Sequence, residues 1–168
     1  MTGEPDFGRI KAIALDVDGV LTDGGFWWGP DGEEWKRFCF ADVMGISLGR
    51  KAGLVFSLIS GEDSPLIDRY AAKMGIADVY KGCKDKAAAV CDFAARHGLD
   101  LAEIAFMGDD VNDLGAMAVV GLSAAPANAR GEVIDVVAFV SEFIGGDGAV
   151  RNVIDRILFQ KNCQGDAK

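Results

Sequence analysis

Short apolar runs alternate with helical patterns along this sequence, and that alternation limits the possible folds more than any other feature. The runs are predicted to be strands of a buried sheet, and they occupy residues 10–16, 54–60, 78–81, 104–107, 122–124 and 137–140. Helical patterns fill most of the segments between them, at about 42–51, 65–74, 84–97, 112–119 and 149–159. Strands that alternate with helices predict an α/β fold, in which a Rossmann-like parallel sheet carries helices on both faces.

One aromatic segment, at about 24–40, interrupts this alternation directly after the first predicted strand. Its two aromatic runs, GGFWW and EWKRFCF, flank the turn-forming residues 29–32, which is typical of a protruding β-hairpin. No segment after either of the first two strands is long enough for a separate cap domain. We therefore predict a single domain over residues 1–168, with a flexible polar tail at about 160–168.

The charge and the cysteines limit the possible partners and the cellular compartment. A formal net charge of −9 argues against nucleic acid or an anionic membrane as a partner. No apolar run approaches the length of a membrane span, and the first residues do not resemble a signal peptide. The four cysteines show no C-x-x-C spacing, so reduced thiols are expected. These features predict a soluble cytoplasmic protein.

Polar side chains that are suited to catalysis or ligand binding follow several of the predicted strands. Asp16 and Asp18 come after the first strand, Ser60 ends the second, Lys86 follows the third, and Asp109 follows the fourth. In an open parallel sheet, ligands bind at the carboxyl ends of the strands. These side chains, although far apart in sequence, are therefore expected to converge on one edge of the sheet.

This combination of side chains suits the transfer of a phosphoryl group. Asp16, Asp109 and the backbone carbonyl of Asp18 would make a hard oxygen site for Mg²⁺. Asp16 would also be the nucleophile that accepts the phosphoryl group, and Asp18 the general acid and base. Ser60 and Lys86 would bind the phosphate oxygens, although Lys84 is an alternative to Lys86.

Asp113 lies four residues beyond Asp109, and two roles are open for it. It is either a carboxylate that supports the metal site from behind or a charge that stabilises a helix N-terminus. The whole pattern predicts a Mg²⁺-dependent phosphatase with a phosphoaspartate intermediate.

These residues resemble the four motifs of the haloacid dehalogenase superfamily of phosphatases. The matching pieces are DVDGVLTD at 16–23, Ser60, Lys86 and GDDVND at 108–113. A narrower resemblance is to the capless phosphatases that act on 3-deoxy-D-manno-octulosonate 8-phosphate, and to their relatives that act on nine-carbon ulosonic acid 9-phosphates. It is carried by LTDGGFWWGPDGEEWKRF, the segment around Asp42, GCKDK and GGDGAVR.

The narrower resemblance implies an assembly as well as a substrate. It implies a homotetramer whose hairpins pair around an axis and in which neighbouring chains help to close each active site. The loop at 145–151, which includes Arg151, is a candidate for that closure. The implied substrate is a small sugar-acid phosphate.

Residues 60–62 depart from the pattern of the eight-carbon enzymes. Those enzymes commonly have Thr-Gly-Arg where this chain has Ser60, Gly61 and Glu62. Glutamate at this position, with Lys73 eleven residues later, is similar to the relatives that act on the nine-carbon substrate. The resemblance therefore slightly favours a nine-carbon ulosonate, unless Glu62 simply faces solvent.

Two functions of other classes also fit parts of the pattern. A receiver-like domain accepts phosphate in an acidic Mg²⁺ pocket, but it has no general acid two residues after the phosphorylated aspartate. The resemblance also allows a non-catalytic oligomerisation module of a sugar-acid pathway. Such a module would not need the complete set of acidic residues that this chain retains.

Overall fold

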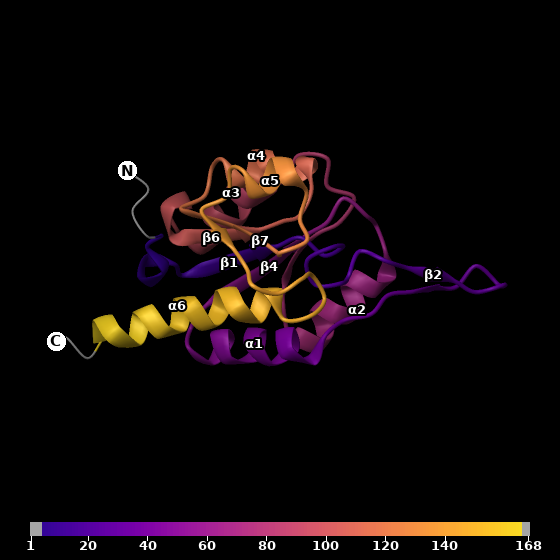
Figure 1. The fold of residues 1–168 in the computed structure, drawn as a ribbon, viewed down its shortest axis with the longest axis horizontal. Helices are drawn as coiled ribbons and strands as arrows, with labels where there is room; N and C mark the ends of the chain where they lie inside the picture. Colours follow the sequence, from indigo (N-terminus) through magenta and orange to yellow (C-terminus); the bar gives the residue numbers. More distant parts are fainter. Residues whose placement is uncertain (1–4, 166–168) are drawn as a thin grey trace.

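The centre of the molecule is a six-stranded parallel sheet in a computed structural model that describes residues 5–165 (Figure 1). Its strands lie in the order β5-β4-β1-β6-β7-β8. They are β1 (Ala12–Leu15), β4 (Val55–Ile59), β5 (Asp78–Tyr80), β6 (Ile104–Met107), β7 (Leu122–Ala125) and β8 (Phe139–Val140). Each strand pairs in parallel with its neighbours, so all six carboxyl ends lie at the same edge. This arrangement confirms the predicted fold.

Helices cover both faces of the sheet, as the sequence predicted (Figure 1). One face carries α1 (Phe40–Lys51), α2 (Pro65–Met74) and α6 (Ala149–Gly165), and the other carries α3 (Lys86–His97), α4 (Leu114–Met117) and α5 (Gly131–Ile134). Single 3₁₀ turns occur at Phe7–Arg9, Leu101–Glu103 and Val111–Asp113. Each layer of helices encloses its own apolar cluster, around Leu15 and Ile154 on one face and around Phe93 and Phe106 on the other. The central strands are thus buried from both sides, which holds their ends in place.

Local signals explain where α2 begins and ends and where α3 begins. Ser64 caps α2 by accepting the N–H of Leu66 at 3.3 Å, and Gly75 ends the helix in the left-handed conformation. Helix α3 begins at Lys86, two residues later than predicted. The Asp85 carboxylate caps it by accepting the N–H of Ala88 at 3.0 Å. Lys86 therefore belongs to the first turn of α3, next to the strand ends.

Helix α6 continues to Gly165, beyond the point near residue 159 where we expected it to end. The reason is a pair of contacts with the N-terminal 3₁₀ turn. Gln160 accepts the N–H of Gly8 at 3.1 Å, and Lys161 donates to the Gly8 carbonyl at 3.2 Å. The expected polar tail is thus helical as far as residue 165, and residues 166–168 lie outside the described part.

The predicted hairpin is present and projects from the end of the molecule (Figure 1). It consists of β2 (Trp27–Trp28) and β3 (Glu34–Trp35), which pair antiparallel with each other. Its aromatic side chains face solvent; Trp28, for example, is 71% exposed. Among the described residues, no helix combines the length and the apolar character that crossing a membrane requires.

Candidate active site

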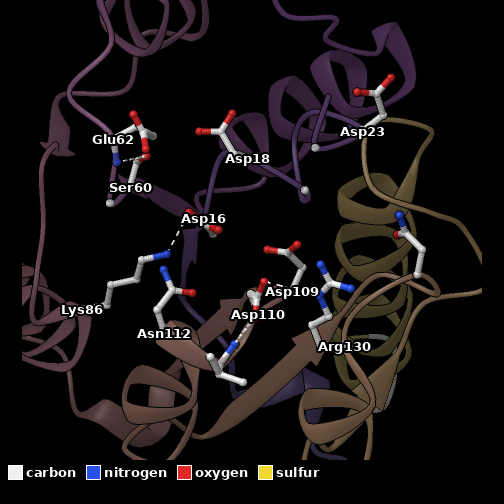
Figure 2. Close-up of a pocket in the computed structure, with 15 residues that line it drawn as sticks. Asp16, Asp18, Asp23, Ser60, Glu62, Lys86, Asp109, Asp110, Asn112 and Arg130 are labelled. Atoms are coloured by element: carbon white, nitrogen blue, oxygen red, sulfur yellow. Dashed lines mark hydrogen bonds and ion pairs between the residues drawn. The ribbon is translucent and has the colours of Figure 1, made fainter. Parts of the chain in front are cut away.

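Most of the predicted site residues meet at the carboxyl ends of the central strands, where a cavity of about 670 Å³ is lined by Asp16, Asp18, Ser60, Glu62, Lys86 and Asp109 (Figure 2). Strands β4 and β5 lie on one side of β1 in the sheet, and β6, β7 and β8 lie on the other. The chain therefore crosses from one side of β1 to the other after β5. Such a change of direction opens a crevice between neighbouring strand ends. Asp16 and Asp18 reach this crevice from β1, Ser60 from β4 and Asp109 from β6. The expected convergence on one edge of the sheet is therefore observed.

A buried ion-pair network holds Asp16. The Lys86 ammonium group lies 2.9 Å from Asp16 Oδ1 and 2.6 Å from Asp113 Oδ1. All three side chains are buried, and Asp113 is completely so. Lys84 is exposed and does not line the cavity, so Lys86 is the lysine that the fold brings to the site.

Asp113 lies behind the site and fixes its neighbours. Its Oδ2 accepts the backbone N–H groups of Asp109 at 2.9 Å and Asp110 at 3.2 Å, while its Oδ1 receives Lys86. Both carboxylate oxygens are thus occupied by the protein. This arrangement is the one expected of a supporting carboxylate rather than of a direct metal ligand.

The acidic cluster needs additional positive charge. Burial raises the pKa of Asp16 to about 8, with a further contribution from the Asp113 charge that Lys86 only partly offsets. Burial raises the pKa of Asp109 to about 6, and Asp113 and Asp110 add to that effect. Oxygens of Asp16, Asp109 and Asp113 lie within 4.8 Å of one another. Closely spaced carboxylates that resist ionisation are stabilised by a hard divalent cation, so Asp16 and Asp109 fit Mg²⁺ as ligands, with Asp113 supporting them from behind.

Asp18 has one carboxylate oxygen paired and one free. Its Oδ1 lies 2.7 Å from the ammonium group of Lys36, a residue at the base of the hairpin whose side chain is only 6% exposed. Its Oδ2 is buried and has no hydrogen-bond partner within the described residues. An acidic oxygen without a partner among the described residues, near the Asp16 carboxylate, fits the predicted role of Asp18 as a general acid and base.

Ser60 and Glu62 form another part of the cavity wall (Figure 2). Ser60 is buried, and its hydroxyl accepts the N–H of Glu62 at 3.1 Å. That hydrogen bond leaves the hydroxyl proton available to a phosphate oxygen. Glu62 lines the cavity and is also exposed to solvent, so its part in selecting the substrate stays a prediction.

Lys73 and Arg151, the other predicted specificity residues, do not line this cavity. Lys73 lies over the ring of Phe40, 5.8 Å from its centroid, in a separate groove between α1 and α2. Arg151 pairs with Asp155 at 2.7 Å, and its backbone N–H binds Asp42 at 2.8 Å. A single chain does not bring either residue to the active site.

The glycine-rich loop before α6 packs against the site of its own chain. The N–H of Gly146 donates to the carbonyl of Val20 at 3.0 Å, and a side chain at Gly145 would overlap the carbonyl of Gly19. The loop therefore supports the turn that follows Asp16. Its predicted role in closing a neighbouring site stays a prediction.

Several cavity residues were not anticipated from the sequence. Asn112 follows Asp109 within the motif, and its position there was a usable signal. Asn128 and Arg130 come from the turn after β7, whose end lies at the same edge of the sheet. Lys36, which pairs with Asp18 but does not line the cavity, comes from the hairpin, and no local pattern in the sequence points from the hairpin to the strand ends.

Comparison with known proteins agrees with this geometry. The family model described as haloacid dehalogenase-like hydrolase matches residues 55–154. A curated relative, the 3-deoxy-D-manno-octulosonate 8-phosphate phosphatase KdsC of Salmonella typhi, is 35% identical over 160 residues, which is 95% of this chain and 85% of the relative.

Two solved structures of enzymes with that phosphatase name have closely similar folds. The one from Yersinia pestis has a TM-score of 0.91 and 35% identity, over 93% of this chain and 84% of the other. The one from Moraxella catarrhalis, in complex with magnesium ion, phosphate ion and KDO, has a TM-score of 0.90 and 32% identity, over 95% and 92% of the two chains. The chain therefore belongs to the haloacid dehalogenase-like hydrolases, and within them to the phosphatases.

Proposed function

We propose that this chain hydrolyses the phosphate monoester of a 3-deoxy-2-ulosonic acid through a phosphoaspartate on Asp16. The observation that carries this proposal is the position of Asp16. Its carboxylate lies in the cavity at the end of the central strand, beside Asp109 and in contact with Lys86. The names of the similar enzymes supply the class of substrate.

The reaction divides into two steps. In the first step an oxygen of Asp16 bonds to phosphorus, the bond from phosphorus to the sugar oxygen breaks, and Asp18 gives a proton to the leaving alkoxide. In the second step Asp18 takes a proton from water, and the resulting hydroxide attacks phosphorus. Inorganic phosphate leaves and Asp16 is regenerated. Ser60 and Lys86 bind the non-bridging oxygens of the phosphoryl group.

Mg²⁺ would be held by the carboxylates of Asp16 and Asp109 and by the backbone carbonyl of Asp18. When bound, it neutralises charge on the phosphoryl oxygens and keeps Asp16 ionised. Asp113 contributes indirectly, because it holds the Asp109 backbone and Lys86 in place.

Substitution of the two catalytic aspartates tests this chemistry. Asp16→Asn should abolish phosphate release, because an amide cannot form the acyl phosphate. Asp18→Asn should slow it by about 10²–10⁴-fold, the usual contribution of general acid–base catalysis. Asp31→Asn, an equivalent change at an exposed residue of the hairpin turn, is the control. Normal turnover by purified Asp16→Asn protein would contradict the assignment of Asp16 as the nucleophile.

The length of the sugar acid is a finer question, and two observations favour different answers. The names of the relatives favour the eight-carbon 8-phosphate. Glu62, followed by Lys73 eleven residues later, favours the nine-carbon 9-phosphate, because this pair resembles the relatives that act on that substrate, and a glutamate on the cavity wall accepts hydrogen bonds from sugar hydroxyl groups. We give slightly more weight to Glu62, since it is a feature of this chain's own cavity.

A parallel assay decides between the two substrates. Wild-type protein should have the higher kcat/KM for the nine-carbon 9-phosphate. Glu62→Arg should lower that value by about 10- to 100-fold, the range of one hydrogen bond to a charged group, and affect the eight-carbon substrate less. If the wild type prefers the eight-carbon compound, Glu62 does not select the substrate, whereas the phosphatase assignment stands.

We also propose that the active form is a homotetramer assembled through the hairpins. The exposed aromatic side chains of Phe26, Trp27, Trp28 and Trp35 support this, because a small domain rarely leaves so many on one projection. In such an assembly, Lys73 and Arg151 of one chain would be available to the active site of a neighbouring chain.

A further inference from the structure

We propose that Arg130, assisted by Asn128, binds the carboxylate of the substrate on the wall of the cavity opposite Glu62. This inference rests on the proposed function and deepens it, because it names the group that would recognise a sugar acid rather than a neutral sugar. It is carried by the charges of the cavity, by the rigidity of the turn that bears Arg130, and by the position of its side chain.

With Lys86 assigned to the phosphate, the charges of the cavity leave one cation within the described residues for a second anionic group of the ligand. Within the described residues, the lining contains six carboxylates and two cationic side chains, Lys86 and Arg130. Lys86 is buried between Asp16 and Asp113, so both of its strong contacts are with the protein. Arg130 is 70% exposed, and its contact with Asp110, at 3.5 Å, is at the limit of a hydrogen bond. A ligand with a second anionic group would therefore meet Arg130.

The backbone that carries Arg130 is fixed from two directions. The N–H of Arg130 donates to the carbonyl of Asp109 at 2.9 Å, which ties the turn to the predicted metal site. The N–H of Ala127 donates to the carbonyl of Phe143 at 2.9 Å. A long side chain on a fixed backbone can reach a ligand without movement of the loop.

Asn128 adds a neutral donor to the same wall. Its Oδ1 accepts the N–H of Gly145 at 3.0 Å, so its amide nitrogen is the end that is left to donate. Both Asn128 and Arg130 line the cavity. A guanidinium group with an adjacent amide suits a planar carboxylate, which accepts two parallel hydrogen bonds from arginine.

The two walls of the cavity differ in the groups that they offer. Arg130 projects from the side of Asp109 and Asp110, whereas Ser60 and Glu62 lie across the cavity, beyond Asp16 and Asp18 (Figure 2). With the phosphate at Asp16, the carboxylate end of the substrate would turn toward Arg130. The sugar hydroxyls would then face Glu62, and the pairing of the carboxylate with Arg130 explains how an acidic cavity admits a substrate with two anionic groups.

The experiment compares substrates with and without the carboxylate. For Arg130→Ala, kcat/KM should fall by about 10- to 100-fold on the ulosonate phosphate, mainly through KM, as for the loss of a hydrogen bond to a charged group. On p-nitrophenyl phosphate, which has no carboxylate, the kcat/KM of Arg130→Ala should differ from that of the wild type by less than about twofold. Arg156→Ala, which removes an exposed arginine that pairs with Glu142 outside the cavity, is the matched control.

A binding measurement keeps the test independent of turnover. By calorimetry, Arg130→Ala should lose affinity for the free ulosonic acid, the dephosphorylated product, and keep the wild-type affinity for Mg²⁺. Equal losses on both substrates, or no loss on the ulosonate, would overturn the role of Arg130. A wild-type protein that shows no preference for ulosonate phosphates would instead overturn the proposed function, and this inference with it.

Discussion

The carboxyl group of Asp16 is buried among other acids, and this has a consequence for the metal-free protein. In the unfolded chain an aspartate has a pKa of about 3.9. In the fold, burial raises the pKa of Asp16 to about 8 and that of Asp109 to about 6. Between the pKa of the unfolded aspartate and the pKa of each group in the fold, the folded state binds more protons than the unfolded state. The contribution of these groups to stability is therefore complete below about pH 4 and is lost as the pH rises through the folded pKa values.

We expect Mg²⁺ to stabilise the protein more at pH 8 than at pH 5.5. At the higher pH the metal compensates carboxylates that are costly to ionise, whereas at the lower pH protons already do so. Thermal unfolding with Mg²⁺ and with EDTA at both values measures the difference. Asp16→Asn should flatten the pH dependence of the metal-free protein. A larger Mg²⁺ effect at pH 5.5 would contradict the expectation.

Gly19 is the residue whose small size the site needs most. It has φ +89°, and a side chain there would overlap the Asp109 carboxylate. Gly19→Ala should therefore displace Asp109 and weaken Mg²⁺ binding, in addition to the backbone strain of about 1–2 kcal/mol. Gly32→Ala is a matched control, because Gly32 has φ +80° and no atom within 4 Å of the added methyl group. Titration with Mg²⁺ should give a lower affinity for Gly19→Ala than for Gly32→Ala. Equal affinities would show that the overlap with Asp109 does not disturb the metal site.

The sequence was informative for site residues that follow a predicted strand. Asp16, Ser60 and Asp109 could be placed together because the carboxyl ends of parallel strands share an edge. Lys36 could not, because its position depends on where the hairpin packs. Arg130 lies in the turn beyond the predicted strand at 122–124, and the position of its side chain depends on how that turn packs against Asp109. Such long-range contacts leave no periodic pattern in the sequence.

At the scale of elements, the hairpin is linked to the chemistry through Lys36. The ion pair of Lys36 with Asp18 is almost completely buried at the lysine end, and Glu34 lies 3.4 Å from the same ammonium group. We expect the pair to hold Asp18 in the orientation that serves the leaving group. Lys36 is therefore a positioning residue.

Lys36→Met should lower kcat by about 10- to 100-fold on an alkyl phosphate, a part of the full acid–base contribution. With p-nitrophenyl phosphate, whose leaving group needs no proton, formation of the phosphoenzyme should be nearly unchanged. Stopped-flow measurement of p-nitrophenol release resolves that step. Lys36→Arg should restore part of the activity, and Lys84→Met, at an exposed lysine, is the control. Equal slowing with both leaving groups would indicate a general structural defect.

Element boundaries show a similar limit to prediction from sequence. The six strands and the hairpin could be predicted from apolar runs and turn residues, because those patterns are local. The extension of α6 to Gly165 depends on the contacts of Gln160 and Lys161 with Gly8 at the other end of the chain. A polar composition alone therefore suggested a frayed tail where the fold supplies partners.

At the scale of the whole molecule, we expect four chains to associate through the aromatic surface of the hairpins. Light scattering should give the mass of a tetramer at micromolar concentration. The double variant Trp27→Ser, Trp28→Ser should give smaller species, because both indoles are exposed on the hairpin. Val136→Ser, at another exposed apolar residue, is the control. A monomeric wild-type protein would contradict the proposal.

The hairpin also has a consequence for inhibitor design. Its outer part presents tryptophans to solvent, and its base holds Lys36 against Asp18. In the proposed tetramer these tryptophans lie at contacts between chains, so a peptide that binds them in place of a neighbouring hairpin and displaces Lys36 from Asp18 would stop proton transfer without entering the polar cavity. Such a peptide would be non-competitive with substrate and would not need to mimic phosphate.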